Sequence, residues 1–113
     1  AVPYSSIFPY VRGVVHHGGC TTNGLGLLYG CPTLVIPLAL DQYFYGRMDN
    51  RLGAGPAPLY IRKKLCTTEQ IESALLDLVS GQYDEAARVI SAKMQRENGV
   101  VCAADAIEKY VRG

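Results

Sequence analysis

Net charge, paired cysteines and long apolar runs are all scarce in this sequence of 113 residues. Eleven basic and ten acidic residues leave a net charge of +1, too weak a field for nucleic acid or an acidic membrane to be the main partner. No apolar run reaches the roughly 20 residues that a membrane-spanning helix needs, so we expect membrane contact to be peripheral at most.

The four cysteines, at positions 20, 31, 66 and 102, include no Cys-x-x-Cys pair and follow no secretory leader. Reduced thiols in a cytoplasmic protein are the simplest expectation. A zinc site built from His16, His17 and Cys20 is conceivable, but the other cysteines lie far away in the sequence, so we expect no metal. The hydrophobic share of 49% and the charged share of 19% are typical of a globular chain with one modest core.

Strand signals alternate with helix signals in the first half of the chain. The apolar run 11–15 ends in His-His-Gly-Gly, which predicts a short buried strand followed by a tight turn. The next segments predict a helix over 22–29, a strand over 33–37, a helix over 42–52 and a short edge strand over 56–60.

Three helices are predicted in the second half of the chain, over 67–81, 83–97 and 101–111. Thr67 and Gln70 have the spacing of a capping box that opens the first of these helices. The residues expected to form the apolar faces are Ile71, Leu75, Leu78 and Val79 in the first helix and Ala86, Val89, Ile90 and Met94 in the second.

The alternation predicts an α/β fold, a Rossmann-like parallel sheet flanked by helices and joined by right-handed crossovers. Three strands are few for such a sheet. Val2-Pro3-Tyr4 also has the character of a connector rather than of an opening strand. We therefore expect residues 1–113 to form one domain whose first strands are missing or are supplied by another chain.

The glycine turn after the first strand has the chemistry of a phosphate site. Backbone N–H groups at the start of a helix have no internal partners, and the helix dipole adds positive charge there. The residues that would approach or contact an anion are His17, Gly18, Gly19, Thr21, Thr22 and Asn23. A turn that serves only packing is an equally good interpretation of these residues alone, since neither a P-loop nor a Gly-x-Gly-x-x-Gly pattern is present.

Asp41-Gln42 follows the second strand and its Pro37–Leu40 turn. In a parallel sheet this pair and the glycine turn lie at the carboxyl ends of neighbouring strands, where ligands bind. A carboxylate beside an amide is suited to binding sugar hydroxyls. Asp41 serving only as a helix N-cap is an equally good interpretation of the pair.

Taken in order, these motifs resemble those of the UDP-sugar-dependent glycosyltransferases of the two-domain GT-B fold. The motifs are Val14-Val15-His16-His17-Gly18-Gly19-Cys20-Thr21-Thr22, Gly30-Cys31-Pro32, Pro37 and Asp41-Gln42. The branch most similar is that of the sterol glucosyltransferases and bacterial antibiotic glycosyltransferases, with further matches at Val2-Pro3, Phe8, 53–58 and 97–100. The similarity covers nearly the whole chain and implies a partial C-terminal, donor-binding half of a GT-B glycosyltransferase.

The resemblance implies a role for each matching position. His17, Gly18, Gly19, Cys20, Thr21 and Thr22 would bind the diphosphate of the donor. Asp41 and Gln42 would hold the donor sugar, and Val2 and Pro3 would lie beside the nucleobase. The implied chemistry is inverting transfer of a hexose to a lipid, sterol-like or other small-molecule hydroxyl, with a UDP-sugar as donor substrate and no cofactor.

The resemblance also implies that this chain lacks a catalytic residue of its own. The general base of the family is a histidine of the amino-terminal acceptor domain, which would have to be supplied in cis or in trans. Two positions depart from the branch pattern: Thr21 stands at a usual glycine, and Leu25 stands where plant relatives carry a ribose-binding glutamate.

Plainer interpretations remain beside these. His16 is expected to be packed or bonded to the backbone, and Cys20 to be a backbone contact rather than a nucleophile. Tyr43, Phe44 and Tyr45 are expected to be core or pocket wall. The leading functional hypothesis is an enzyme module, inactive alone, and the alternative is a non-catalytic half domain that pairs with a partner chain or self-associates through a sheet edge.

Overall fold

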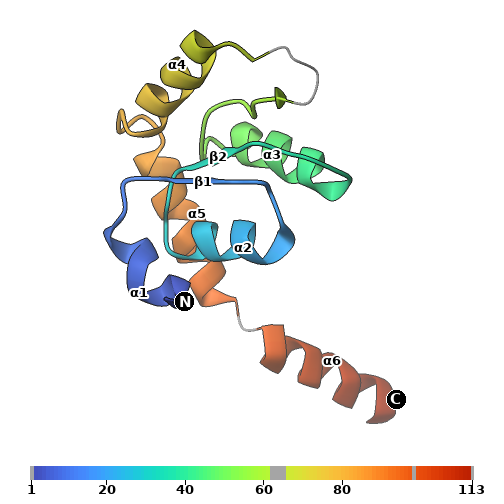
Figure 1. Ribbon diagram of the computed structural model, residues 1–113. Helices are drawn as coiled ribbons and strands as arrows, with labels where there is room; N and C mark the ends of the chain where they lie inside the picture. The colour runs from blue at the N-terminus through green and yellow to red at the C-terminus, as the bar shows by residue number, and fades with distance from the viewer. Residues whose placement is uncertain (1, 62–65, 98, 113) are drawn as a thin grey trace.

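The computed structural model describes residues 2–61, 66–97 and 99–112. A 3-10 helix, η1, and two strands join six α-helices in these ranges (Figure 1). In chain order the elements are α1 (Tyr4–Ile7), η1 (Phe8–Tyr10), β1 (Val14–His16), α2 (Cys20–Leu28), β2 (Thr33–Val35), α3 (Asp41–Arg51), α4 (Thr68–Leu78), α5 (Asp84–Arg96) and α6 (Gly99–Arg112).

β1 and β2 form a parallel pair, with Val14 opposite Thr33 and His16 opposite Val35. The predicted parallel sheet is therefore confirmed, although both strands are shorter than the predicted ranges 11–15 and 33–37. The expectation that the first strand is buried is wrong, because Val15 is 45% exposed. β1 has only β2 beside it among the described residues, which leaves its other edge uncovered.

The edge strand predicted over 56–60 does not form. Pro56 and Pro58 have no N–H to donate, so the segment cannot build a continuous ladder. The chain from Ala54 to Leu59 lies beside β2 through two backbone bonds, from the Leu59 N–H to the Val35 carbonyl at 3.1 Å and from the Thr33 N–H to the Ala54 carbonyl at 2.8 Å.

The chain is helical before β1, in α1 and η1; of the predicted connector Val2-Pro3-Tyr4 only Tyr4 lies in a helix, and none of it is a strand. Phe8 is buried in η1, stacks on Tyr4 at a ring distance of 4.8 Å and meets the edge of Tyr29 at 6.3 Å. The Cys31 thiol also donates to the Phe8 carbonyl at 3.1 Å. These contacts hold the start of the chain against the C-terminal end of α2.

The predicted helices form within three residues of their expected bounds, but the side chains that face inward differ from those expected. The core cluster consists of Leu34, Ala74 and Leu78, with Leu59 packed against it. Three of the four apolar residues expected inward on α4 are exposed, namely Ile71, Leu75 and Val79. On α5 the buried residues are Ala87 and Ser91, and Val89 is exposed. Small residues face inward because α5 packs closely on α2, where the Ser91 hydroxyl reaches the Leu28 carbonyl at 2.6 Å.

The capping box at the start of α4 is confirmed. The Gln70 N–H donates to the Thr67 hydroxyl at 3.2 Å, and the Thr67 N–H donates to the Gln70 side-chain oxygen at 2.8 Å. This reciprocal pair satisfies two backbone donors that the helix itself leaves unbonded.

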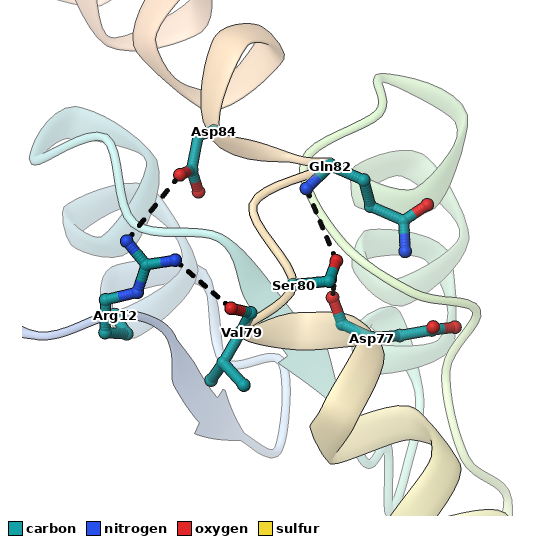
Figure 2. A network of polar contacts seen from close by, with 6 residues as sticks. All are labelled: Arg12, Asp77, Val79, Ser80, Gln82 and Asp84. Atoms are coloured by element: carbon teal, nitrogen blue, oxygen red, sulfur yellow. Dashed lines mark hydrogen bonds and ion pairs between the residues drawn. The ribbon is translucent and has the colours of Figure 1, made fainter.

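Arg12, just before β1, bonds to the end of α4 and lies beside the start of α5 (Figure 2). Its guanidinium donates to the Val79 carbonyl at 3.1 Å and lies 3.8 Å from the Asp84 carboxylate. Inside the turn that Arg12 contacts, the Ser80 hydroxyl donates to the Asp77 carbonyl at 2.6 Å. Arg12 thus fixes the end of β1 that is remote from the glycine turn.

α6 extends away from the other elements (Figure 1), and its side chains from Val101 to Arg112 are exposed. This helix begins at Gly99, two residues before the predicted start at Val101. All four cysteines are unpaired thiols.

In the described ranges, no helix combines the length and the apolar character needed to cross a bilayer. The same ranges contain no cluster of three or more histidine, cysteine, aspartate or glutamate side chains that could ligate a metal ion.

Candidate functional site

The two turns that follow β1 and β2 lie against each other. Gly18 has φ of +92°, and a Cβ built on it would lie 2.8 Å from Val35 Cγ1 and 3.0 Å from the Gln42 carbonyl oxygen. Only a residue without a side chain permits this approach. The glycine turn and the start of α3 therefore form one continuous surface at the carboxyl ends of the two strands.

His16 is hydrogen-bonded to the glycine turn through one ring nitrogen and to β2 through the other. Its Nδ1 accepts the Gly18 N–H at 3.0 Å, so the ring proton is on Nε2 and is donated to the Thr33 hydroxyl at 2.8 Å. Burial lowers the pKa of His16 to about 4, and the neighbouring His17 adds to the shift. Both nitrogens are engaged and the ring is neutral, which confirms a bonded, structural histidine.

His17 is exposed and lies beside the N-terminus of α2. A Cβ on Gly19 would lie 2.7 Å from His17 Nε2, so the imidazole covers that glycine closely. Gly19 is the N-cap of α2 and supplies no side chain to bond the first backbone donors. The N–H groups of Cys20, Thr21 and Thr22 thus open toward the same space as the His17 ring, an arrangement that favours an anion.

Gln42 shapes the second turn with its side chain. Its Oε1 accepts the Leu38 N–H at 2.8 Å and the Ala39 N–H at 3.0 Å, which leaves its NH₂ group as the donor for any ligand. The N-cap of α3 is Leu40, at φ of +51°, and it makes no side-chain cap. Asp41 is therefore not the cap that one interpretation expected; it is the first helical residue, and it is exposed.

A hydrogen bond joins the two helices at the rim of the site. The Tyr45 hydroxyl of α3 donates to the Cys20 sulfur at the start of α2 at 3.5 Å. This bond raises the pKa of Tyr45, and the carboxylate of Asp41 adds to the shift. Tyr45, Cys20 and Asp41 therefore lie close together at the rim, and Tyr45 forms part of the wall between the two turns.

Below the turns, Asn23 and Asp49 join α2 to α3 inside the protein. They are 3% and 1% exposed, and the Asn23 Nδ2 donates to the Asp49 Oδ1 at 3.2 Å. Burial raises the pKa of Asp49 to about 6, and the bond from Asn23 opposes the rise. The expectation that Asn23 offers its side chain to the glycine turn is wrong, because that side chain is committed to Asp49.

The structure thus brings most of the expected site residues to one surface, namely His17, Gly18, Gly19, Cys20, Thr21, Thr22, Asp41 and Gln42. Val2 and Pro3 are exposed, and α1, which follows them, packs on η1. The placement of Val2 and Pro3 beside a nucleobase stays a prediction.

Two contacts of this region are not predicted from the sequence, namely the bond between Tyr45 and Cys20 and the bond between Asn23 and Asp49. Tyr45 carried a usable signal, because it follows Asp41 by one helical turn and therefore shares its face. Nothing in the sequence indicates that Asn23 and Asp49 meet, because they are 26 residues apart and no local motif pairs them.

The chain is similar to several known proteins. Residues 1–108 match the family described as Erythromycin biosynthesis protein CIII-like, C-terminal domain. The chain is 37% identical over 119 residues to a terpene cyclase-glycosyl transferase fusion protein of Humicola fuscoatra, covering 96% of this chain and 9% of that protein. It is 32% identical over 109 residues to a sterol 3-beta-glucosyltransferase of Arabidopsis thaliana, covering 96% of this chain and 17% of that one.

A solved structure, the glycotransferase of kitacinnamycin, superposes with a TM-score of 0.83 at 26% identity, over 96% of this chain and 28% of that one. The chain therefore spans less than a third of the length of each of these relatives. By the family match, the similarity to glycosyltransferases and the shared fold, this chain belongs to the erythromycin biosynthesis protein CIII-like C-terminal domains of the GT-B glycosyltransferases.

Proposed function

We propose that this chain is the donor-binding part of an inverting glycosyltransferase that moves a hexose, most simply glucose, from a UDP-sugar to a lipid, sterol-like or other small-molecule hydroxyl. The observation that carries the proposal is the contact between the two turns, where Gly18 lies against the backbone of Gln42. That contact supports the proposal because a helix start, which favours an anion, lies beside the carboxylate of Asp41 and the amide of Gln42, which are suited to sugar hydroxyls.

The diphosphate would lie at the start of α2. The unbonded N–H groups of Cys20, Thr21 and Thr22 and the exposed ring of His17 supply donors, and the dipole of α2 supplies partial positive charge. In the reaction the acceptor oxygen bonds to the anomeric carbon, and the bond from that carbon to the diphosphate oxygen breaks. The same donors would stabilise the negative charge that develops on the leaving diphosphate, which requires neither a metal nor a cofactor.

The hexose would lie at the start of α3. Asp41 can accept hydrogen bonds from sugar hydroxyls, and the NH₂ group of Gln42 can donate one, since its oxygen is already engaged by the turn. The side chains at these two positions would therefore orient the anomeric carbon without reacting themselves.

The general base would come from an acceptor domain, joined in cis or in trans. His16 is unsuited to the task, because both of its nitrogens are bonded and its pKa is about 4. The alternative function is a non-catalytic half domain that pairs with another chain. The exposed edge of β1 at Val15 favours it, because uncovered strand edges recruit partners.

Titration calorimetry of the purified chain with UDP and with UDP-glucose tests the proposal. We expect saturable binding, and a loss of about tenfold in affinity for His17→Ala, corresponding to one charge-assisted or strong hydrogen bond of about 1.4 kcal/mol. Tyr110→Ala is the matched control, because that tyrosine is 89% exposed on α6. A folded chain that binds neither ligand would contradict the proposal, and sedimentation as a dimer would then favour the alternative.

A further inference from the structure

The Asn23–Asp49 pair contains two buried oxygens to which no described residue donates a hydrogen bond. One hydrogen bond joins the pair, from Asn23 Nδ2 to Asp49 Oδ1 at 3.2 Å. The remaining oxygens, Asn23 Oδ1 and Asp49 Oδ2, have no hydrogen-bond partner within the described part of the chain. Such atoms carry the full cost of desolvation when they are left unbonded, so their presence calls for a donor.

One proton would satisfy both oxygens. The two atoms belong to the same two planar groups that already share a hydrogen bond, an amide and a carboxyl. If Asp49 carries a proton on Oδ2, that O–H can donate to Asn23 Oδ1 while Asn23 Nδ2 donates to Asp49 Oδ1. The result is a cyclic, uncharged pair in which every oxygen has a donor, whereas an ionised Asp49 leaves a buried charge and two unmet acceptors.

We propose that Asp49 and Asn23 form this doubly hydrogen-bonded pair when Asp49 is protonated, and that the pair positions α2 against α3 so that the two turns of the donor site stay in contact. Asn23 and Asp49 are positioning residues, since they lie below the two turns and would affect the UDP-sugar only through them. The link to donor binding rests on the proposed function, whereas the protonated pair itself does not.

The surroundings favour the neutral form. α2 and β2 contribute no carboxylate or cation to the pair; the one ionisable group of α2 is Cys20, which is bonded to Tyr45 at the rim. On β1, His16 is neutral and engaged by Thr33 and Gly18. On α3 itself, Asp41, Arg47 and Arg51 are exposed. Burial accordingly raises the pKa of Asp49 from 3.8 to about 6.

The direction of the pH effect follows from that pKa. Between about pH 4 and pH 6 the folded chain holds a proton on Asp49 that the unfolded chain has released. Raising the pH through this range therefore weakens folding, by about 100-fold in the unfolding constant, since each pKa unit is a factor of ten. His16 titrates in the same range with the opposite sign, so the effect must be measured against a variant that keeps His16.

Asp49→Asn is that variant. An amide at position 49 can donate to Asn23 Oδ1 and accept from Asn23 Nδ2, which reproduces the neutral pair at every pH. Urea unfolding is measured for the unsubstituted chain and for Asp49→Asn from pH 4 to pH 7. Over this range the unfolding constant of the unsubstituted chain should rise by about 100-fold relative to that of Asp49→Asn. The His16 contribution is common to both proteins and cancels.

A carbon-13 titration of the Asp49 carboxyl in the unsubstituted chain, assigned with the Asp49→Asn spectrum, measures the same proton directly. A midpoint near pH 6 supports the pair. A midpoint near pH 4, or a ratio of unfolding constants that does not change with pH, would overturn it.

The positioning role has its own measurement. We expect the UDP affinity of the unsubstituted chain to weaken several-fold, relative to that of Asp49→Asn, as pH rises from 5 to 7.5; ionisation of UDP affects both proteins equally. A constant affinity ratio, with a confirmed carboxyl midpoint near pH 6, would refute the positioning role alone. If neither protein binds UDP, the proposed function fails, and the carboxyl titration still decides whether the pair exists.

Discussion

The contact between the two turns can be tested by adding one methyl group at Gly18. An alanine there must keep φ of +92°, which costs an L-residue about 1–2 kcal/mol. Its Cβ would lie 2.8 Å from Val35 Cγ1 and 3.0 Å from the Gln42 carbonyl oxygen, well inside the ordinary contact distance of roughly 3.5–4.0 Å. Overpacking of this kind costs about 1–3 kcal/mol. We therefore expect Gly18→Ala to lower the free energy of unfolding by about 2–5 kcal/mol.

The same substitution at Gly24 is the matched control. Gly24 lies in α2, and a Cβ there would have no heavy atom of the described residues within 4 Å. Alanine is favoured over glycine in a helix by about 1 kcal/mol, so Gly24→Ala should be stabilising. The two variants should differ by about 3–6 kcal/mol in urea unfolding followed by circular dichroism.

Ligand binding distinguishes a local from a global effect of Gly18→Ala. Because the Gln42 contact is with backbone, the added methyl must move the turns apart, and UDP affinity measured under folded conditions should fall. Gly24→Ala should leave that affinity unchanged. The reasoning about the two turns is refuted if Gly18→Ala unfolds at the same urea concentration as the unsubstituted chain and binds UDP equally well.

Two further predictions concern the same turns. Burial lowers the pKa of His16 from 6.5 to about 4, so between these values the unfolded chain binds a proton that the folded chain does not. Because the ring is partly exposed and solvent screens the effect, we expect a loss of about 1–2 kcal/mol of stability as pH falls from about 6.5 to 4, less than the full shift would give. The stability of His16→Gln relative to that of the unsubstituted chain should therefore rise as pH falls from about 6.5 to 4 in urea unfolding, since the opposing effect of Asp49 is common to both proteins. A stability difference that does not change with pH would contradict this prediction. Leu40→Gly should raise the free energy of unfolding by about 1 kcal/mol, because Leu40 is at φ of +51° and 89% exposed, so little packing is lost; a lower urea midpoint would show that Leu40 is not strained.

The helices of this chain could be predicted closely because their signals are local. The capping box of Thr67 and Gln70 depends on residues three apart, and the structure forms it as the spacing indicates. The segment 56–60 has the apolar pattern of a strand but does not form one, because Pro56 and Pro58 lack the N–H groups that a ladder needs. The apolar pattern of α4 predicts that Ile71 and Leu75 face inward, and this is wrong, because both are exposed. Ala74 and Leu78 are the buried residues of this helix.

The sequence by itself determined where a donor site was to be sought. Glycines after one strand, an Asp-Gln pair after the next, and the rule that parallel strands end at one edge were enough to predict that the residues around 18 and 42 are neighbours. Each of these signals is carried by a few consecutive residues, so no knowledge of the packing was required.

Tertiary structure alone decided how that site is held in place. His16 is fixed by Thr33, 17 residues away, and Asn23 meets Asp49, 26 residues away. Neither side chain shows in its own segment whether it will face solvent or a partner. Their protonation depends on burial and on which groups remain unbonded, and both are properties of the packed chain rather than of any local run of residues.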